Sequence, residues 1–173
     1  TINKLATSIS FDDTSLGSMT YGETLNIAAT KGDASIAGTV SYSISNEDDN
    51  TADASVTGSV VSVTQSGQFK AIATFTPDAS DTYAVSSVEK TITVSKKTVT
   101  IAFASADQTT NVNGDDINNT ASISEGQVGS QTATIAYTRT VGTDNMATVV
   151  SSTGAVTIGS VAGSVTIQAK VSD

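Results

Sequence analysis

The chain has 173 residues, of which 38% are hydrophobic and only 5% aromatic, and it contains no Trp, Cys or His. A Ser–His nucleophile, cysteine chemistry and a Cys/His zinc site are therefore excluded. The formal net charge of −9 at pH 7 disfavours nucleic acid and anionic membrane surfaces as partners, and no apolar run is long enough for insertion across a bilayer.

Short segments with apolar residues at every second position follow one another along the chain, separated by turn residues. Val, Ile, Thr and Tyr suit a pleated strand better than a helix, and no apolar repeat of helical spacing lasts three turns. The sequence predicts an all-β fold. In the first half we expect strands near residues 7–11, 24–30, 39–45, 59–63, 68–75 and 88–94. In the second half we expect them near 98–103, 120–124, 133–138, 155–158 and 164–171, with a turn at Asn113-Gly114 because both residues tolerate positive φ.

The two halves repeat one plan. SISF at residues 8–11 matches TIAF at 100–103, and VSYSIS at 40–45 matches IAYTRT at 135–140, which places Tyr42 at the position of Tyr137. Two glycines lie nine residues apart in each half (67 − 58 and 163 − 154). Because these matches occur in the same order, they predict two copies of one domain.

The predicted domains are residues 1–96 and 97–173, each an immunoglobulin-like β-sandwich. The junction, TVSKKTVTI at residues 93–101, has no Gly or Pro, so we expect two sandwiches joined end to end by a short connection. In the first copy the segment 67–75 is followed by a further strand at 88–94. The second copy stops after the matching segment 163–171, and we predict that its terminal strand is missing.

The residues resemble bacterial immunoglobulin-like (Big) domains, which occur in tandem in microbial surface proteins. The first copy carries the likeness in YGETLNIAAT, GTVSYSIS and SGQFKAIATFTPDASDTYAVSSVEKTITVSKKTVTI, and the second in ATVVSSTGAVTIGSVAGSVTIQAKV. The resemblance implies a sandwich fold, an extracellular or cell-surface location, and a stalk or adhesive role such as that in adhesins, surface-layer proteins and virion appendages. It implies no catalytic or ligand-binding residues, because the group shares none.

Acidic residues gather in the predicted loops, and the densest cluster, SNEDDN, is the candidate calcium site. Its ligands would be Glu47, Asp48 and Asp49 with Asp53, since calcium prefers six to eight oxygen ligands. The cluster lacks the spacing and the glycine of an EF-hand. The other interpretation is that these carboxylates only solvate the loops, and no cofactor is then required.

Three hypotheses for function follow. The first is a non-enzymatic structural or adhesive module that spaces or presents a binding tip, with neighbouring immunoglobulin-like domains or identical subunits as protein partners. The second is a self-assembling filament or surface-layer subunit, completed by strand donation from a neighbour, with residues 1–11 as a candidate donor. The third, a carbohydrate-binding accessory domain, is disfavoured by the absence of Trp. An enzyme is not expected, since the acidic residues lie in loops without accompanying aromatics.

Overall fold

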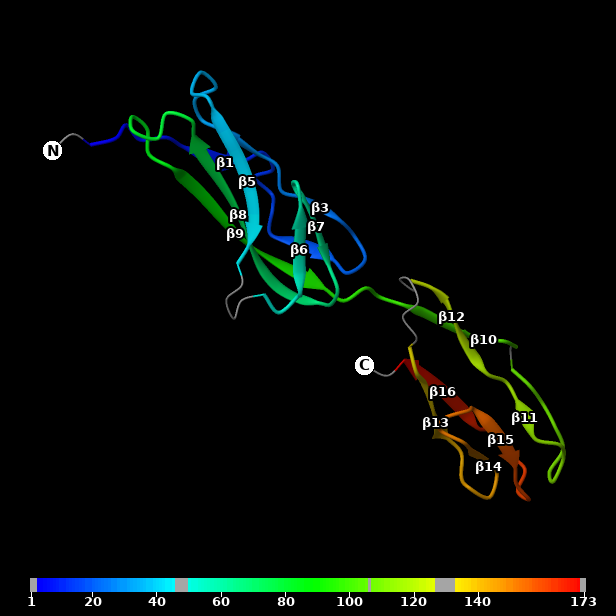
Figure 1. The fold of residues 1–173 in the computed structure, drawn as a ribbon. Coiled ribbons are helices and arrows are strands. Elements are labelled where there is room, and N and C mark those ends of the chain that lie inside the picture. Colours follow the sequence, from blue (N-terminus) through cyan, green and yellow to red (C-terminus); the bar gives the residue numbers. More distant parts are fainter. Residues whose placement is uncertain (1–2, 46–49, 106, 127–132, 172–173) are drawn as a thin grey trace. The chain divides into compact units, whose positions relative to one another are not determined.

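The computed structural model describes residues 3–45, 50–105, 107–126 and 133–171. The regular secondary structure of these described residues consists of β-strands, as predicted. The chain divides into two compact units, Thr1–Lys97 (unit 1) and Thr98–Asp173 (unit 2), and most of their strands are labelled in Figure 1. Among the described residues no helix has the length and apolar character needed to cross a membrane.

One layer of unit 1 is a four-stranded sheet in the order β2-β9-β8-β5. The strands β9, β8 and β5 pair antiparallel, whereas β2 runs parallel to β9. Their bounds are Ser18–Thr20 (β2), Gly38–Ile44 (β5), Gly67–Pro77 (β8) and Ser86–Ser95 (β9).

The other layer of unit 1 consists of shorter strands: β1 (Ile9–Phe11), β3 (Leu25–Asn26), β4 (Ala29–Lys31), β6 (Ala54–Thr57) and β7 (Val60–Val63). Two of them, β3 and β4, are successive parts of one chain segment. The first part pairs with β7, which also pairs with β6, and the second part pairs with β1. Reading that segment as one strand, the two layers have the ABED and CFG order of an immunoglobulin-like sandwich, with β2 added beside β9.

Alternating side chains from both layers form the core of unit 1. Phe69 and Ala71 of β8, Ile92 of β9 and Val61 of β7 are all fully buried, together with Ile27 between β3 and β4. The alternate, outward positions of β8 and β9 are mostly polar or charged, with Ile72 as the apolar exception. Burial of apolar area between two such faces is the main favourable term for a sandwich of this size.

The described residues of unit 2 form three small antiparallel sheets: β10 with β12, β11-β15-β14, and β13 with β16. Their bounds are Thr100–Phe103 (β10), Ile117–Asn118 (β11), Ala121–Glu125 (β12), Ile135–Val141 (β13), Ala147–Val149 (β14), Ala155–Ile158 (β15) and Thr166–Val171 (β16). Here β11 and β12 divide one segment between two partners, as β3 and β4 do in unit 1.

The strand registers confirm the predicted repeat. Phe11 pairs with Ala29 in unit 1, and Phe103 pairs with Ala121 in unit 2. Tyr42 lies opposite Ala73, as Tyr137 lies opposite Ala169. The turn predicted at Asn113-Gly114 is also present, with Asn113 at φ 51° and the Gly114 N–H donating to Asn111 O at 3.0 Å.

Candidate functional site

The predicted calcium cluster is only partly described. Glu47, Asp48 and Asp49 lie outside the described residues, so their ligand role stays a prediction. Asp53 has φ 48° and its Oδ2 accepts a hydrogen bond from Thr64 Oγ1 at 2.7 Å. In the part of the chain that the structure describes, no three acidic or other metal-binding side chains come together. The hydrogen bond from Thr64 gives Asp53 a structural role in the turn before β6, and its role as a calcium ligand stays a prediction as well.

Two other loop carboxylates, Asp13 and Asp33, organise their own turns. Each accepts hydrogen bonds from the hydroxyl and the backbone N–H of the serine two residues later, Ser15 and Ser35, at 2.6–2.9 Å. The hydroxyl bond first, and then the backbone bond, lowers the pKa of each carboxyl group below its ordinary value of 3.8. These hydrogen bonds stabilise the two loops and favour the ionised form of each carboxyl group.

The repeated tyrosines connect the two layers. Tyr42 Oη accepts a hydrogen bond from Ala29 N at 3.0 Å, and Tyr137 Oη accepts one from Ala121 N at 2.9 Å. In unit 2 the same hydroxyl also donates to Ala121 O at 3.3 Å. Ala29 and Ala121 are the first residues of β4 and β12, where the β3–β4 and β11–β12 segments change their pairing partner. At these positions the tyrosine hydroxyl takes the place of a hydrogen bond from a neighbouring strand.

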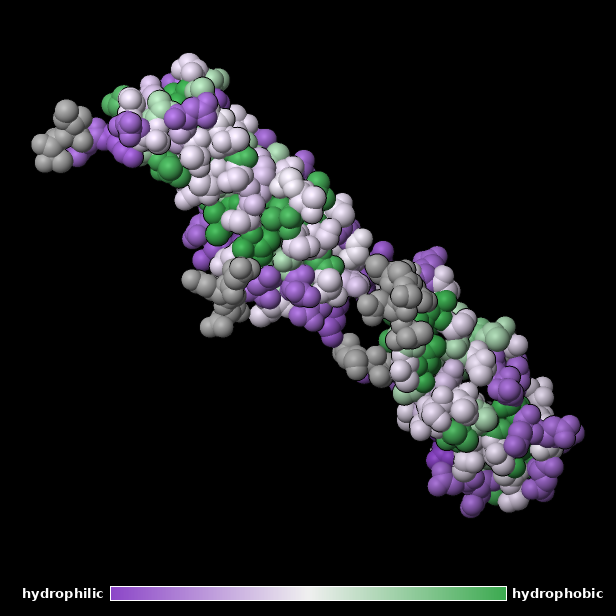
Figure 2. All heavy atoms as spheres, in the orientation of Figure 1, coloured by the Kyte–Doolittle hydropathy of each residue, from purple (hydrophilic) through white to green (hydrophobic). Residues whose placement is uncertain are grey.

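The open edge of β16 is the main difference between the two units. In unit 1, β8 pairs with β5 on one side and with β9 on the other. In unit 2, β16 pairs with β13 on one side, and no strand within the described ranges pairs with its other side. This is the place of the terminal strand that the sequence predicts to be missing. Figure 2 shows hydrophobic residues reaching the surface in both units.

Burial along the two matching strands reflects this difference. The inward residues Phe69, Ala71, Ala73 and Phe75 of β8 are fully buried. The matching residues of unit 2 are each only half-buried: Val165, Ile167, Ala169 and Val171. An aliphatic side chain left partly in water forgoes part of the roughly 1.5–3 kcal/mol that full burial provides.

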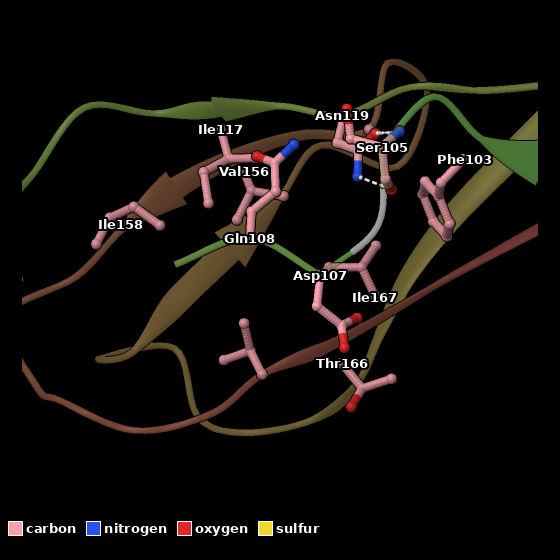
Figure 3. A pocket seen from close by; sticks show the side chains of 12 residues that line it. Phe103, Ser105, Asp107, Gln108, Ile117, Asn119, Val156, Ile158, Thr166 and Ile167 are labelled. Carbon is pink, nitrogen blue, oxygen red and sulfur yellow. Dashed lines mark hydrogen bonds between the residues drawn. The ribbon is translucent and has the colours of Figure 1, made fainter. Parts of the chain in front are cut away.

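A cavity of about 370 Å³ opens beside β16. Figure 3 shows apolar side chains converging on it from several strands, among them Phe103 of β10, Ile117 of β11, Val156 of β15 and Ile167 of β16. The rim is polar. There the Asn119 amide is hydrogen bonded to both backbone groups of Ser105, at 2.9 and 3.0 Å. An apolar floor with a polar rim suits apolar side chains of a polypeptide better than a charged ligand.

Arg139 links β13 to the loop before β14 and to β14 itself. It is a half-buried residue of β13 that lies opposite Ile167 of β16. Its guanidinium group donates to Ala147 O and to Asp144 Oδ1, the latter at 2.5 Å. Sequence reasoning did not assign this ion pair or the cavity residues. Two of the cavity residues, Val165 and Ile167, were nevertheless detectable in the sequence. They belong to the alternating apolar pattern of the predicted strand at 164–171, which is not followed by a further predicted strand.

No established protein family matches the sequence, and no curated protein matches it. Among solved structures, the chain is similar to mouse cadherin-23 EC22-24, with 16% identity and a TM-score of 0.39 over 94% of this chain and 59% of that one. It is also similar to human protocadherin-24 EC1-2, with 13% identity and a TM-score of 0.36 over 87% and 76% of the two chains. The titin domains z1z2 in complex with telethonin match at 12% identity and a TM-score of 0.41, over 98% of this chain and 96% of that one.

The chain spans about three-fifths of the length of the cadherin-23 structure that it matches. With TM-scores of this size, the immunoglobulin-like description rests on the strand pairing within unit 1. The likenesses do not establish a bacterial origin or a Big-domain identity.

Proposed function

We propose that the chain is a non-enzymatic structural module of a secreted or cell-surface microbial protein, acting as a spacer in a stalk or presenting a binding tip. The resemblance to tandem surface domains supports the location. The observation that carries the proposal is the pairing of β2 with β9 in unit 1. These strands lie near the two ends of the unit and run parallel, with Ser18 opposite Thr93 and Thr20 opposite Ser95.

Parallel pairing of a strand near the start of the unit with its last strand suits a part that bears tension. Force entering before β1 and leaving after β9 pulls β2 and β9 in opposite directions along their own axes. The bonds between them are then loaded together instead of one after another. Two of these bonds run from Tyr21 N to Ser95 O and from Thr93 N to Gly17 O, both at 2.9 Å.

Single-molecule stretching of the whole chain tests this proposal. Tyr21→Pro removes the N–H that donates to Ser95 O, and we expect it to lower the unfolding force of unit 1 clearly. The matched control is Ala34→Pro, which lies in the exposed turn closed by Ile36 N and Asp33 O at 3.4 Å. Proline is favoured at this second turn position, so the force should not change. Equal forces for both variants and the parent would refute the load-bearing role.

The second candidate function is a self-assembling subunit completed by strand donation, and the open edge of β16 favours it. The candidate donor at residues 1–11 is partly used within unit 1, however. There Ile9 is buried and β1 pairs with β4. A donor of this kind would have to leave its own unit first. Calcium at the loop cluster, carbohydrate binding and a role in a virion appendage have no supporting contact among the described residues and are not proposed further.

A further inference from the structure

We propose that Lys90 prevents unit 1 from pairing edge to edge with a second copy of the chain. The edge concerned is the outer side of β9, in the stretch that no other part of unit 1 covers. This inference goes beyond the spacer role and does not depend on it. A sheet edge with unpaired N–H and C=O groups is a template for another strand, and a charged side chain at an inward position blocks such pairing.

Unit 1 covers the two ends of this edge with its own chain. At one end β2 pairs with residues 93–95 of β9. At the other end Leu5 forms a parallel bridge with Tyr83, and Ala84 N donates to Leu5 O at 2.9 Å. Among the described residues no strand pairs with the outer side of β9 between these two contacts, so the edge is open there.

The backbone of the open stretch offers hydrogen-bonding groups to a further strand. Thr93 N donates to Gly17 O, so Thr93 turns its backbone groups to the outer side of β9. Every second residue of a strand does the same, which places the N–H and C=O groups of Ser87, Glu89 and Thr91 on the open edge. This stretch is longer than the three-residue pairing of β1 with β4, so it is long enough for a second copy to pair with it.

Lys90 lies within this stretch at an inward position. It is opposite Ala71 of β8, which is fully buried. The following inward residues of β9, Ile92 and Val94, are 0% and 3% exposed, whereas Lys90 is exposed. Because β9 is uncovered at this level, the side chain can start on the core side of the sheet and still hold its ammonium group in water. A strand added to this edge would take the ammonium group out of water, which is costly.

Neither an ion pair nor core packing accounts for a lysine at this position. Among the described residues no acid forms an ion pair with Lys90, and the neighbouring Glu89 pairs with Lys70 at 3.7 Å. An exposed side chain also adds little to the core, and an apolar residue would continue the alternation of Val88 and Ile92. The effect of Lys90 on an approaching strand gives the charge a role.

Like charges add to this effect when two copies pair symmetrically. In an antiparallel pair centred on Glu89, the two glutamates lie opposite each other. In a pair centred on Lys90, the two lysines lie opposite each other instead. Like charges directly opposite each other destabilise a strand pair. Replacing Lys90 by an apolar residue removes the repulsion from the second register, so a dimer of such a variant should be centred on residue 90.

Sedimentation of the full chain over a range of concentrations tests the proposal. Lys90→Val replaces the charge by an apolar side chain that suits a strand. We expect its dimer dissociation constant to be lower than that of the parent on the order of 100-fold, about tenfold for each of the two lysines replaced. Lys90→Thr is a second neutral variant, which keeps the proposal testable if the valine variant does not fold.

Two controls separate the charge and its position from general apolarity. Thr91→Val adds a side chain of the same shape as the valine at position 90, but at the neighbouring exposed, outward position. Lys90→Glu keeps a charge at the inward position. Both controls should sediment as the parent does.

Hydrogen exchange of the Lys90→Val dimer locates its interface. We expect the amides of Ser87, Glu89 and Thr91 to exchange more slowly than in the parent. The proposal is overturned if both neutral variants sediment as the parent does, or if either control associates as strongly as Lys90→Val. Protection confined to another sheet edge, such as that of β5 or β16, would overturn it as well.

Discussion

Replacing Tyr137 by Phe removes a single oxygen atom that satisfies the backbone of unit 2 at a change of strand partner. Ala104 N donates to Thr120 O at 3.0 Å, so Phe103 and Ala121 form a pair without direct hydrogen bonds. The backbone groups of Ala121 consequently point away from β10. They meet the tyrosine hydroxyl instead, with the N–H donating to it at 2.9 Å.

The size of the effect follows from burial. Tyr137 is 5% exposed and Ala121 is 9% exposed, so water has little access to the N–H that the substitution leaves without its partner. A buried, unsatisfied backbone donor costs about 1–3 kcal/mol, and we expect Tyr137→Phe to lower the free energy of unfolding of unit 2 by about 2 kcal/mol. The matching Tyr42→Phe should cost about 1 kcal/mol or less, since Tyr42 and Ala29 are only half-buried and water can replace the hydroxyl.

Urea unfolding followed by NMR measures these changes separately, because resolved amide signals report each unit and no tryptophan is present. A cost of 2 kcal/mol corresponds to a midpoint lower by about 1–2 M for unit 2, with unit 1 unchanged. Tyr83→Phe, which lies outside the strands, is the control for loss of a tyrosine hydroxyl. If Tyr137→Phe shifts the midpoint of unit 2 no more than Tyr83→Phe shifts that of unit 1, the argument from the unsatisfied N–H is wrong.

Two other predictions concern turns. Gly154 has φ 76°, and an added Cβ would lie 2.7–2.9 Å from the ring of Tyr137, whereas Gly58 has φ 60° with no atom within 4 Å of such a Cβ. We expect Gly58→Ala to cost about 1 kcal/mol from the left-handed backbone alone and Gly154→Ala to cost clearly more, and equal thermal shifts would contradict this. Ser15→Ala should raise the pKa of Asp13 toward its ordinary value, as measured by carboxyl NMR titration. Because the folded-state pKa is lowered, the stabilisation by Asp13 is present above pH 3.8 and is lost as the pH falls below it. If Ser15→Ala leaves the titration of Asp13 unchanged, the role assigned to the hydroxyl is wrong.

Long alternating segments were predictable from the sequence, and so were their repetition and the missing terminal strand. The segment that became β8 carries four inward apolar residues, and the segment that contains β16 carries four at the same spacing, from Val165 to Val171; a period of two over this length predicts a strand. Strands of two to four residues are too short to show this alternation clearly. They include β2, β3, β6, β11 and β14. With two to four residues each, they depend on a neighbouring strand to define them.

For the cavity beside β16, the sequence predicted only that no further strand follows residues 163–171. Alternation at Val165, Ile167 and Ala169 indicated a strand with one face in a core, and the matching segment of the first copy indicated that a further strand should follow. Which side chains of other strands meet at that place depends on pairings between residues far apart in the chain. Phe103, Ile117 and Val156 come together only through β10–β12 and β11–β15 pairing.

The sequence by itself determined that this chain is all-β, that it contains two copies of one plan, and that Tyr42 and Tyr137 hold the same position. These properties depend on local periodicity and on internal comparison. Only the tertiary structure decided that β2 runs parallel to β9 and that each tyrosine hydroxyl satisfies a backbone group where a strand changes partner. It also decided that, among the described strands, only β13 pairs with β16. Hydrogen-bond partners and burial are set by which distant segments lie side by side, and no local pattern in the chain records that choice.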